Sequence, residues 1–118
     1  FAVLKKNGLN GKVCVSGQDA TDAGLAAILT GDLSNTVYKA IKAEANGAAS
    51  LAVDLLNGKA AKTNGTTNNG TTDVPSVLLT PVTITKANVE TVVNDGFTTA
   101  AKICAIAGKA ACAKYGVK

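Results

Sequence analysis

The stretch of residues 12–25 constrains the fold more than any other part of the sequence. Residues 13–15 are a short, continuous apolar run, which is typical of a strand covered on both faces. Helix signals begin soon afterwards at Thr21, and Gly17 provides the turn between strand and helix. A second short strand, residues 36–38, follows at the spacing of a crossover helix, so we expect a right-handed βαβ unit and a parallel sheet.

Helices are expected before, between and after these strands in the sequence. Residues 1–6 form a helix that an Asn-Gly pair ends, and a second helix begins at Thr21 or Asp22. The longest helix covers residues 42–56 and carries an apolar stripe made of Ala45, Ala48, Ala49, Ala52, Val53 and Leu56. Hydrophobic residues make up 47% of the chain but aromatic residues only 3%, so the core is expected to consist of small side chains.

The second half of the sequence is less regular. Residues 63–73 form a polar surface loop, which is either a mobile excursion or the tip of a β-hairpin. Residues 75–84 are extended, and their prolines favour an edge strand or a crossover. A short helix over residues 85–93 and a helical tail over residues 98–118, interrupted at Gly108, complete the expected fold.

Composition disfavours several functions. Histidine is absent and no two cysteines are spaced as CxxC, so catalysis with a histidine base and the usual zinc sites are not expected. No glycine-rich phosphate loop occurs, and we expect no cofactor. The 12 basic residues are all lysines and are scattered, which disfavours nucleic acid as a partner. We therefore predict a protein that is not an enzyme.

The length of 118 residues allows one small domain or part of a larger one. The sequence opens on Phe1-Ala2-Val3-Leu4-Lys5-Lys6, a pattern typical of the last turns of a helix, so we expect a fragment of a longer polypeptide. No apolar stretch is long enough, and free enough of charge, to span a membrane, and no signal-peptide pattern occurs.

The 3 cysteines leave two structural alternatives open. If a turn at Gly108 folds the tail back, Cys104 and Cys112 can form a disulfide, which implies an oxidising compartment. If one helix runs straight through, these two residues lie about 12 Å apart, too far for a bridge. Cys14 lies between two valines in the first apolar run, where we expect a buried free thiol.

Charged residues stand where the predicted parallel strands end. Gln18 and Asp19 follow the first strand, and Lys39 follows the second. Ligands of open α/β sheets bind at the carboxyl ends of strands, so we expect Asp19 and Lys39 to meet at one edge of the sheet. Such a pair can bind vicinal hydroxyls, because the carboxylate accepts hydrogen bonds and the ammonium donates them. The alternatives are an Asp19 that complements a helix dipole and a Lys39 that is only solvated.

Several motifs follow one another along almost the whole chain: Val15-Ser16-Gly17-Gln18-Asp19-Ala20, Thr36-Val37-Tyr38-Lys39, Asn68-Asn69-Gly70, Asp73-Val74-Pro75-Ser76-Val77-Leu78-Leu79-Thr80-Pro81 and Asp95-Gly96-Phe97. In this order they resemble the C-terminal part of bacterial ABC-transporter sugar-binding proteins of the type I periplasmic class. The D-xylose-binding family is the most similar branch.

The resemblance implies an α/β fold, a Rossmann-like lobe with a parallel sheet, in which residues 1–118 are an incomplete C-terminal lobe of a two-lobed receptor. It implies that Asp19 and Lys39 hydrogen-bond a monosaccharide such as D-xylose, with Gln18 beside them. Residues 79–82 resemble a hinge crossover between lobes. The tail with its cysteine pair resembles that of actinobacterial members, which implies a disulfide.

The same resemblance implies the partners and the location. The partners would be a pentose-like sugar, the missing N-terminal lobe and an ABC permease in the membrane. The location would be periplasmic or extracellular, with a lipid anchor on the full-length parent as an alternative. A half-site without the other lobe encloses little of a sugar, so little affinity is expected from these residues alone.

Other readings stay open. The chain departs from the family pattern at Cys14, where relatives usually carry proline, and this thiol could join two chains. A fragment with unpaired strand edges could instead self-associate into a structural assembly without sugar binding. An independent enzyme is a third reading, because α/β domains host many activities.

Overall fold

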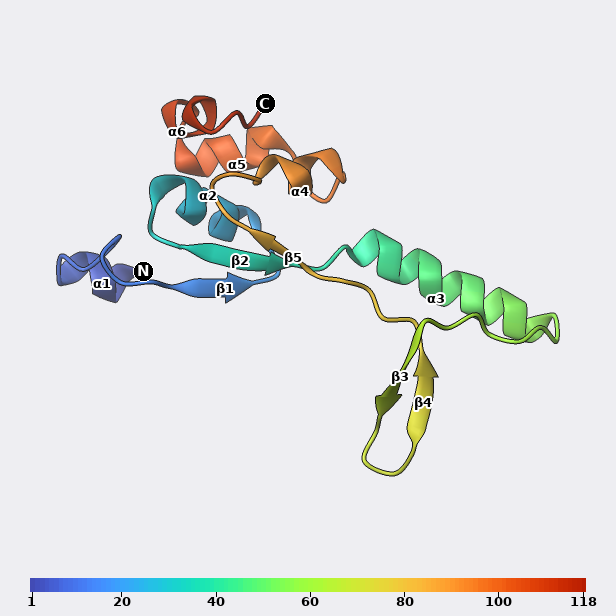
Figure 1. The fold of residues 1–118 in the computed structure, drawn as a ribbon. Helices are drawn as coiled ribbons and strands as arrows, with labels where there is room; N and C mark the ends of the chain where they lie inside the picture. Colours follow the sequence, from blue (N-terminus) through green and yellow to red (C-terminus); the bar gives the residue numbers. More distant parts are fainter. The chain divides into compact units, whose positions relative to one another are not determined.

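The computed structural model describes every residue from Phe1 to Lys118. The chain divides into two compact units: the first unit comprises Phe1–Lys39 and Pro81–Lys118, and the second unit comprises Ala40–Thr80. Figure 1 traces their helices and strands in sequence order. None of the helices combines the length and the apolar character that crossing a bilayer requires.

The sheet of the first unit has its strands in the order β1, β2, β5. Strands β1 (Ser16–Gln18) and β2 (Asn35–Tyr38) run parallel and are joined by helix α2 (Asp22–Thr30), so the predicted βαβ unit is confirmed. Strand β5 (Val82–Ile84) pairs with β2 in the antiparallel direction and lies at the edge of the sheet. The sheet is therefore parallel between β1 and β2 and mixed overall.

The first strand begins later in the sequence than predicted. The apolar run of residues 13–15 precedes β1; Val13 is 43% exposed, and Cys14 is exposed, so the prediction of a buried free thiol is wrong. The reason is a turn that follows helix α1 (Ala2–Lys6). The Val13 amide donates to the Leu9 carbonyl at 3.2 Å, so it does not pair with a neighbouring strand.

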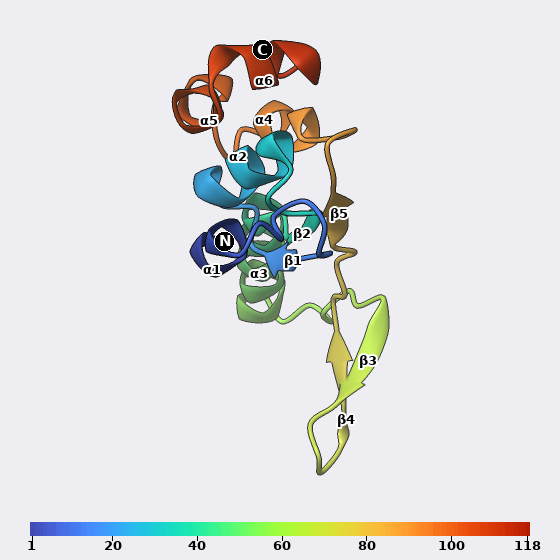
Figure 2. The same ribbon diagram turned by 90° about the vertical axis from the view of Figure 1, so that its left-hand side faces the viewer.

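The core of the first unit lies on one side of its sheet. Helices α2, α4 (Glu90–Asn94), α5 (Ala100–Ala107) and α6 (Lys109–Lys114) gather on that side (Figure 2). Burial alternates along β2, where Thr36 and Tyr38 are buried while Asn35 and Val37 are half-buried, so cover on both faces is not found. The largest fully buried side chains are mainly aliphatic: Leu25, Ile28, Ile84, Val89, Val92 and Ile103, with Thr36.

The helical tail folds back at Gly108, the first of the two alternatives considered for it. Gly108 has a φ of 88°, a conformation that suits glycine, and it separates α5 from α6. The Cα atoms of Cys104 and Cys112 are 5.8 Å apart, and the two residues form a disulfide. Cys112 is also buried, so the bridge holds α6 against the core.

The second unit consists of helix α3 (Ile41–Leu56) and an antiparallel hairpin of strands β3 (Gly65–Asn68) and β4 (Asp73–Ser76). Of the two interpretations of residues 63–73, the hairpin is therefore the observed one. The apolar stripe predicted on α3 is present, but no residue of the helix is buried. The only other element of the second unit is a two-stranded hairpin, which is too small to bury the apolar face of the helix.

Candidate functional site

Asp19 and Lys39 lie at the carboxyl ends of β1 and β2. The parallel register pairs Gln18 with Val37, so Asp19, which follows β1, and Lys39, which follows β2, leave the sheet at the same edge. Lys39 Nζ is 2.8 Å from Asp19 Oδ1, and the two side chains are 46% and 61% exposed. The predicted meeting of a carboxylate and an ammonium at this edge is therefore observed, and both groups are open to solvent.

The turn that carries Asp19 has an unusual backbone. Asp19 has a φ of 79° and Ala20 a φ of 47°, a left-handed conformation that side chains other than glycine rarely adopt. The Asp19 amide donates to the Val37 carbonyl at 2.8 Å, and the buried Ala20 amide donates to Thr36 Oγ1 at 3.3 Å. Such a turn persists only where its surroundings hold it, and these two contacts to β2 are part of that support.

The structure decides between the interpretations of Asp19. Helix α2 begins at Asp22, with Thr21 as its cap, whose side chain accepts a hydrogen bond from the Gly24 amide at 3.2 Å. Asp22 is the acidic residue of the first turn and complements the helix dipole. Asp19 precedes the cap and pairs with Lys39, so it is not the acid of the first helical turn, and Lys39 is not only solvated.

Gln18, the remaining predicted binding residue, is the last residue of β1 and is exposed. No hydrogen bond joins its side chain to the charged pair. Successive side chains along an extended chain point to opposite faces, so the Gln18 side chain is expected on the other face from that of Asp19. The structure therefore joins Asp19 to Lys39 and shows no hydrogen bond from the Gln18 side chain to either of them.

Sequence reasoning missed two part-buried polar contacts, made by the hydroxyl groups of Tyr38 and Thr98. The Tyr38 hydroxyl donates to Asp95 Oδ2, and the Thr98 hydroxyl donates to Asp22 Oδ1. Burial, followed by the hydrogen bond to the Asp95 carboxylate, raises the pKa of Tyr38 to about 12. The motif Asp95-Gly96-Phe97 was the available signal, but nothing in its residue types pointed to Tyr38.

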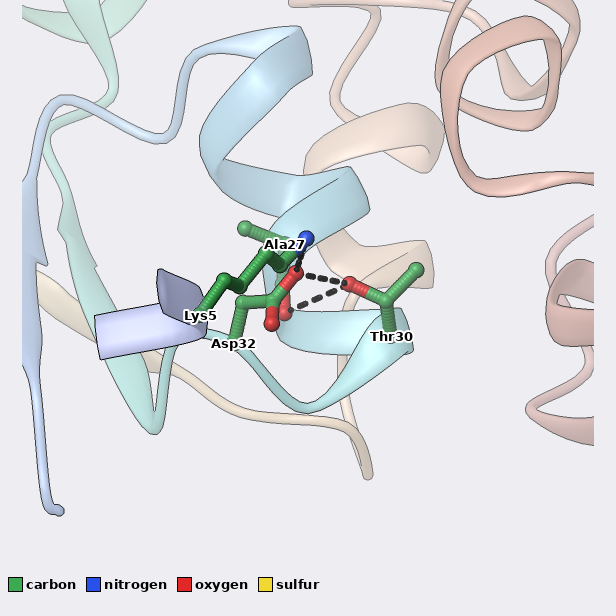
Figure 3. Close-up of polar contacts among 4 residues, drawn as sticks. All are labelled: Lys5, Ala27, Thr30 and Asp32. Atoms are coloured by element: carbon green, nitrogen blue, oxygen red, sulfur yellow. Dashed lines mark hydrogen bonds and ion pairs between the residues drawn. The ribbon is translucent and has the colours of Figure 1, made fainter. Parts of the chain in front are cut away.

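A second polar cluster lies at the other end of α2 and is structural. Asp32 is nearly buried; Lys5 Nζ lies 2.6 Å from its Oδ2, and the Thr30 hydroxyl donates to the same oxygen at 3.2 Å (Figure 3). The hydrogen bond from Lys5 holds the pKa of the Asp32 carboxyl below its usual value of 3.8. The cluster thus connects α1 to the end of α2.

This cluster predicts a pH-dependent loss of stability. Because the folded state lowers the pKa of Asp32, the unfolded state binds more protons at acidic pH, and the stabilisation is lost as pH falls through the folded pKa. Lys5 is 55% exposed, which limits the effect. Replacing Asp32→Asn should lower the free energy of unfolding by about 1–2 kcal/mol above about pH 5, and this difference should shrink as pH falls below the usual carboxyl pKa of 3.8.

Urea unfolding of both proteins across this pH range measures the difference. Asp54→Asn is the matched control, because the Asp54 Oδ1 to Lys59 Nζ distance is 4.0 Å and its loss should change stability little at any pH. A difference between wild type and Asp32→Asn that is the same at all pH values would contradict the role given to the ion pair.

The comparisons with known proteins show the family of this chain. A family model described as a periplasmic binding protein domain matches residues 1–60, and the chain belongs to this family. The chain is 52% identical over 95 residues to the D-xylose-binding periplasmic protein of Escherichia coli (strain K12), covering 80% of this chain and 29% of the relative. It is 44% identical over 97 residues to the Haemophilus influenzae protein of the same name, covering 81% of this chain and 29% of that relative.

A solved structure is similar as well. It is a carbohydrate transporter solute binding protein from Chloroflexus aurantiacus in complex with D-glucose, with a TM-score of 0.71 and 36% identity over 75% of this chain and 26% of the other. The predicted α/β periplasmic binding protein fold is thus confirmed, and so is the prediction of a binding protein rather than an enzyme. The chain spans 29% of the length of both curated relatives.

Proposed function

We propose that these residues are part of one lobe of a two-lobed receptor that binds a monosaccharide and delivers it to an ABC permease for import. The observation that carries the proposal is the Asp19–Lys39 pair, whose charged atoms lie 2.8 Å apart at the ends of parallel strands. Open α/β sheets bind ligands at this position. The names of the relatives, D-xylose-binding periplasmic proteins, give the class of ligand.

The chemistry of the pair suits a sugar. An ionised carboxylate accepts hydrogen bonds from hydroxyl groups, and a lysine ammonium donates up to about three of them. Two vicinal hydroxyls could therefore bridge Asp19 and Lys39, one as donor and the other as acceptor, through charge-assisted bonds. Both side chains are exposed enough for a ligand to reach them.

A pentose such as D-xylose is the proposed ligand. The curated relatives named for D-xylose support it, while the D-glucose complex of the similar solved structure keeps a hexose as the competing choice. Sugar sites bury most of their ligand, and these residues supply only a few polar groups. Affinity therefore requires the second lobe, which we assign to the rest of the polypeptide.

The hinge and the location follow from the same proposal. Residues 79–82 would connect the lobes, which is supported by the boundary between the two units falling between Thr80 and Pro81. The periplasmic names of the relatives and the disulfide support a periplasmic or extracellular location. A lipid anchor on the parent stays a prediction.

Self-association is the second candidate. It is favoured by the exposed apolar residues of α3, with Leu55 61% and Leu56 86% exposed, and by the exposed thiol of Cys14. Large exposed apolar residues that lie together mark surfaces that bind other protein surfaces. A second copy of the chain, or the remainder of the receptor, could cover this helix.

Isothermal titration calorimetry separates the two functions. The full-length receptor should release heat with D-xylose, and D-ribose and D-glucose should rank its preference, while the 118-residue chain should show weak binding or none. Absence of heat with the full-length protein and every sugar would overturn the receptor proposal. Light scattering on this chain, with and without a reducing agent, tests the second candidate; a monomer at high concentration would overturn it.

A further inference from the structure

We propose that the linker of residues 95–98, between α4 and α5, positions the Asp19–Lys39 pair. This inference rests on the proposed function only for its consequence in sugar binding. Its structural basis is that the linker makes one polar contact to each of the two chain segments that carry the pair. Both contacts lie within the first unit.

The first contact holds the segment of Asp19. Thr98 is buried, and its hydroxyl donates to Asp22 Oδ1 at the start of α2. The turn of Asp19 and Ala20 immediately precedes this start. Fixing the first residue of the helix therefore limits how far the turn can move.

The second contact holds the segment of Lys39. The Tyr38 side chain is buried, with only 3% of the residue exposed, and its hydroxyl donates to Asp95 Oδ2. The ring of Phe97 meets the Tyr38 ring edge-on, with centroids 5.3 Å apart and planes at 61°. Aromatic pairs favour this arrangement. The linker therefore contacts both the ring and the hydroxyl of Tyr38. Lys39 is the next residue in the chain.

The charged pair needs such support, because it cannot fix its own geometry. Exposed ion pairs contribute little free energy and do not hold long side chains in one arrangement. The left-handed conformations of Asp19 and Ala20 are costly, and a nearby structure must maintain them. A binding pair that is already in place loses less free energy when the ligand arrives, so positioning should appear as affinity.

Amide hydrogen exchange on the 118-residue chain tests the positioning without any sugar. Thr98→Val removes the hydroxyl and keeps the shape of the side chain. It should speed exchange at the amides of Asp19 and Ala20 about tenfold relative to the amide of the buried residue Ile28 in α2. Thr98→Ser should restore the wild-type ratio, because the hydroxyl returns.

The matched control is Thr30→Val, which removes another hydroxyl bonded to a carboxylate, that of Asp32, at the opposite end of α2. It should leave the Asp19 and Ala20 exchange ratio unchanged. Tyr38→Phe is the second variant of the linker contacts and guards against a Thr98 variant that fails to fold. It keeps the ring and should raise exchange at Asp19, whose amide bonds to the neighbouring Val37 carbonyl.

The outcomes separate this inference from the proposed function. If Thr98→Val and Tyr38→Phe fold and leave the exchange ratio at the wild-type value, the positioning role is overturned. In the full-length receptor, Thr98→Val should weaken sugar affinity about fivefold to tenfold while Thr30→Val does not. If wild-type receptor binds no sugar while exchange still rises in the variants, the receptor proposal fails and the positioning of the pair stands.

Discussion

Replacing both Cys104 and Cys112 by alanine is expected to lower the free energy of unfolding of the first unit by about 2–3 kcal/mol. The disulfide closes a short loop, with a sequence separation of 8, and mainly restricts the unfolded chain. Without it, α6 and the residues after it would be held to the rest of the unit by a small apolar surface that includes Val117. We therefore expect the last helix to open before the core does.

Urea unfolding followed by tyrosine fluorescence measures this loss. The chain has no tryptophan, and both tyrosines, Tyr38 and Tyr115, lie in the first unit, so the signal reports on that unit. Wild-type protein in a reducing agent should match the double variant. Cys14→Ala, which removes the free thiol, should match oxidised wild type. Equal midpoints for oxidised wild type and the double variant would mean that the bridge does not stabilise the fold.

Replacing Asp19→Asn in the full-length receptor is expected to weaken sugar affinity by about 10-fold to 100-fold. The amide keeps the size and one acceptor oxygen of the carboxylate, but it loses the charge that strengthens hydrogen bonds to sugar hydroxyls. Hydrogen bonds to charged groups contribute about 1.5–3 kcal/mol each, which sets this range. The stability of the unbound protein should change little, because the ion pair to Lys39 is exposed.

Calorimetry with D-xylose measures the affinity of this variant. Asp54→Asn serves as the control, since it removes a carboxylate paired with Lys59, at a distance of 4.0 Å, from a part of the chain outside the proposed site. Its affinity should equal that of the wild type. A similar loss in both variants would indicate a general effect of charge and would remove the support for a specific contact.

The sequence predicted those features that depend on local patterns. The spacing of a strand, a helix and a second strand was enough for the βαβ unit, and parallel strands imply that Asp19 and Lys39 share an edge. Gly108 predicted the break in the helical tail, because glycine readily adopts left-handed backbone conformations such as the φ of 88° found there. Each of these inferences needed only residues close together in the chain or one rule of topology.

The features that were missed depend on contacts between distant residues. Tyr38 and Asp95 are separated by 57 positions, and no pattern around either residue indicates the other. The apolar run before β1 looked like a buried strand, but the turn after α1 engages Val13. The apolar stripe on α3 predicts a face that can pack against another surface. Such a pattern does not indicate whether that surface belongs to these residues, and no residue of α3 is buried.

The coupling between Asp19 and Lys39 in sugar binding tests the central claim most directly. Calorimetry with D-xylose on full-length wild type, Asp19→Asn, Lys39→Gln and the double variant gives this coupling. If both residues hold the same sugar, each single change weakens binding, and the two effects differ from simple addition by about 1 kcal/mol or more. Affinities of both single variants within about twofold of the wild type would contradict a sugar site at this edge of the sheet.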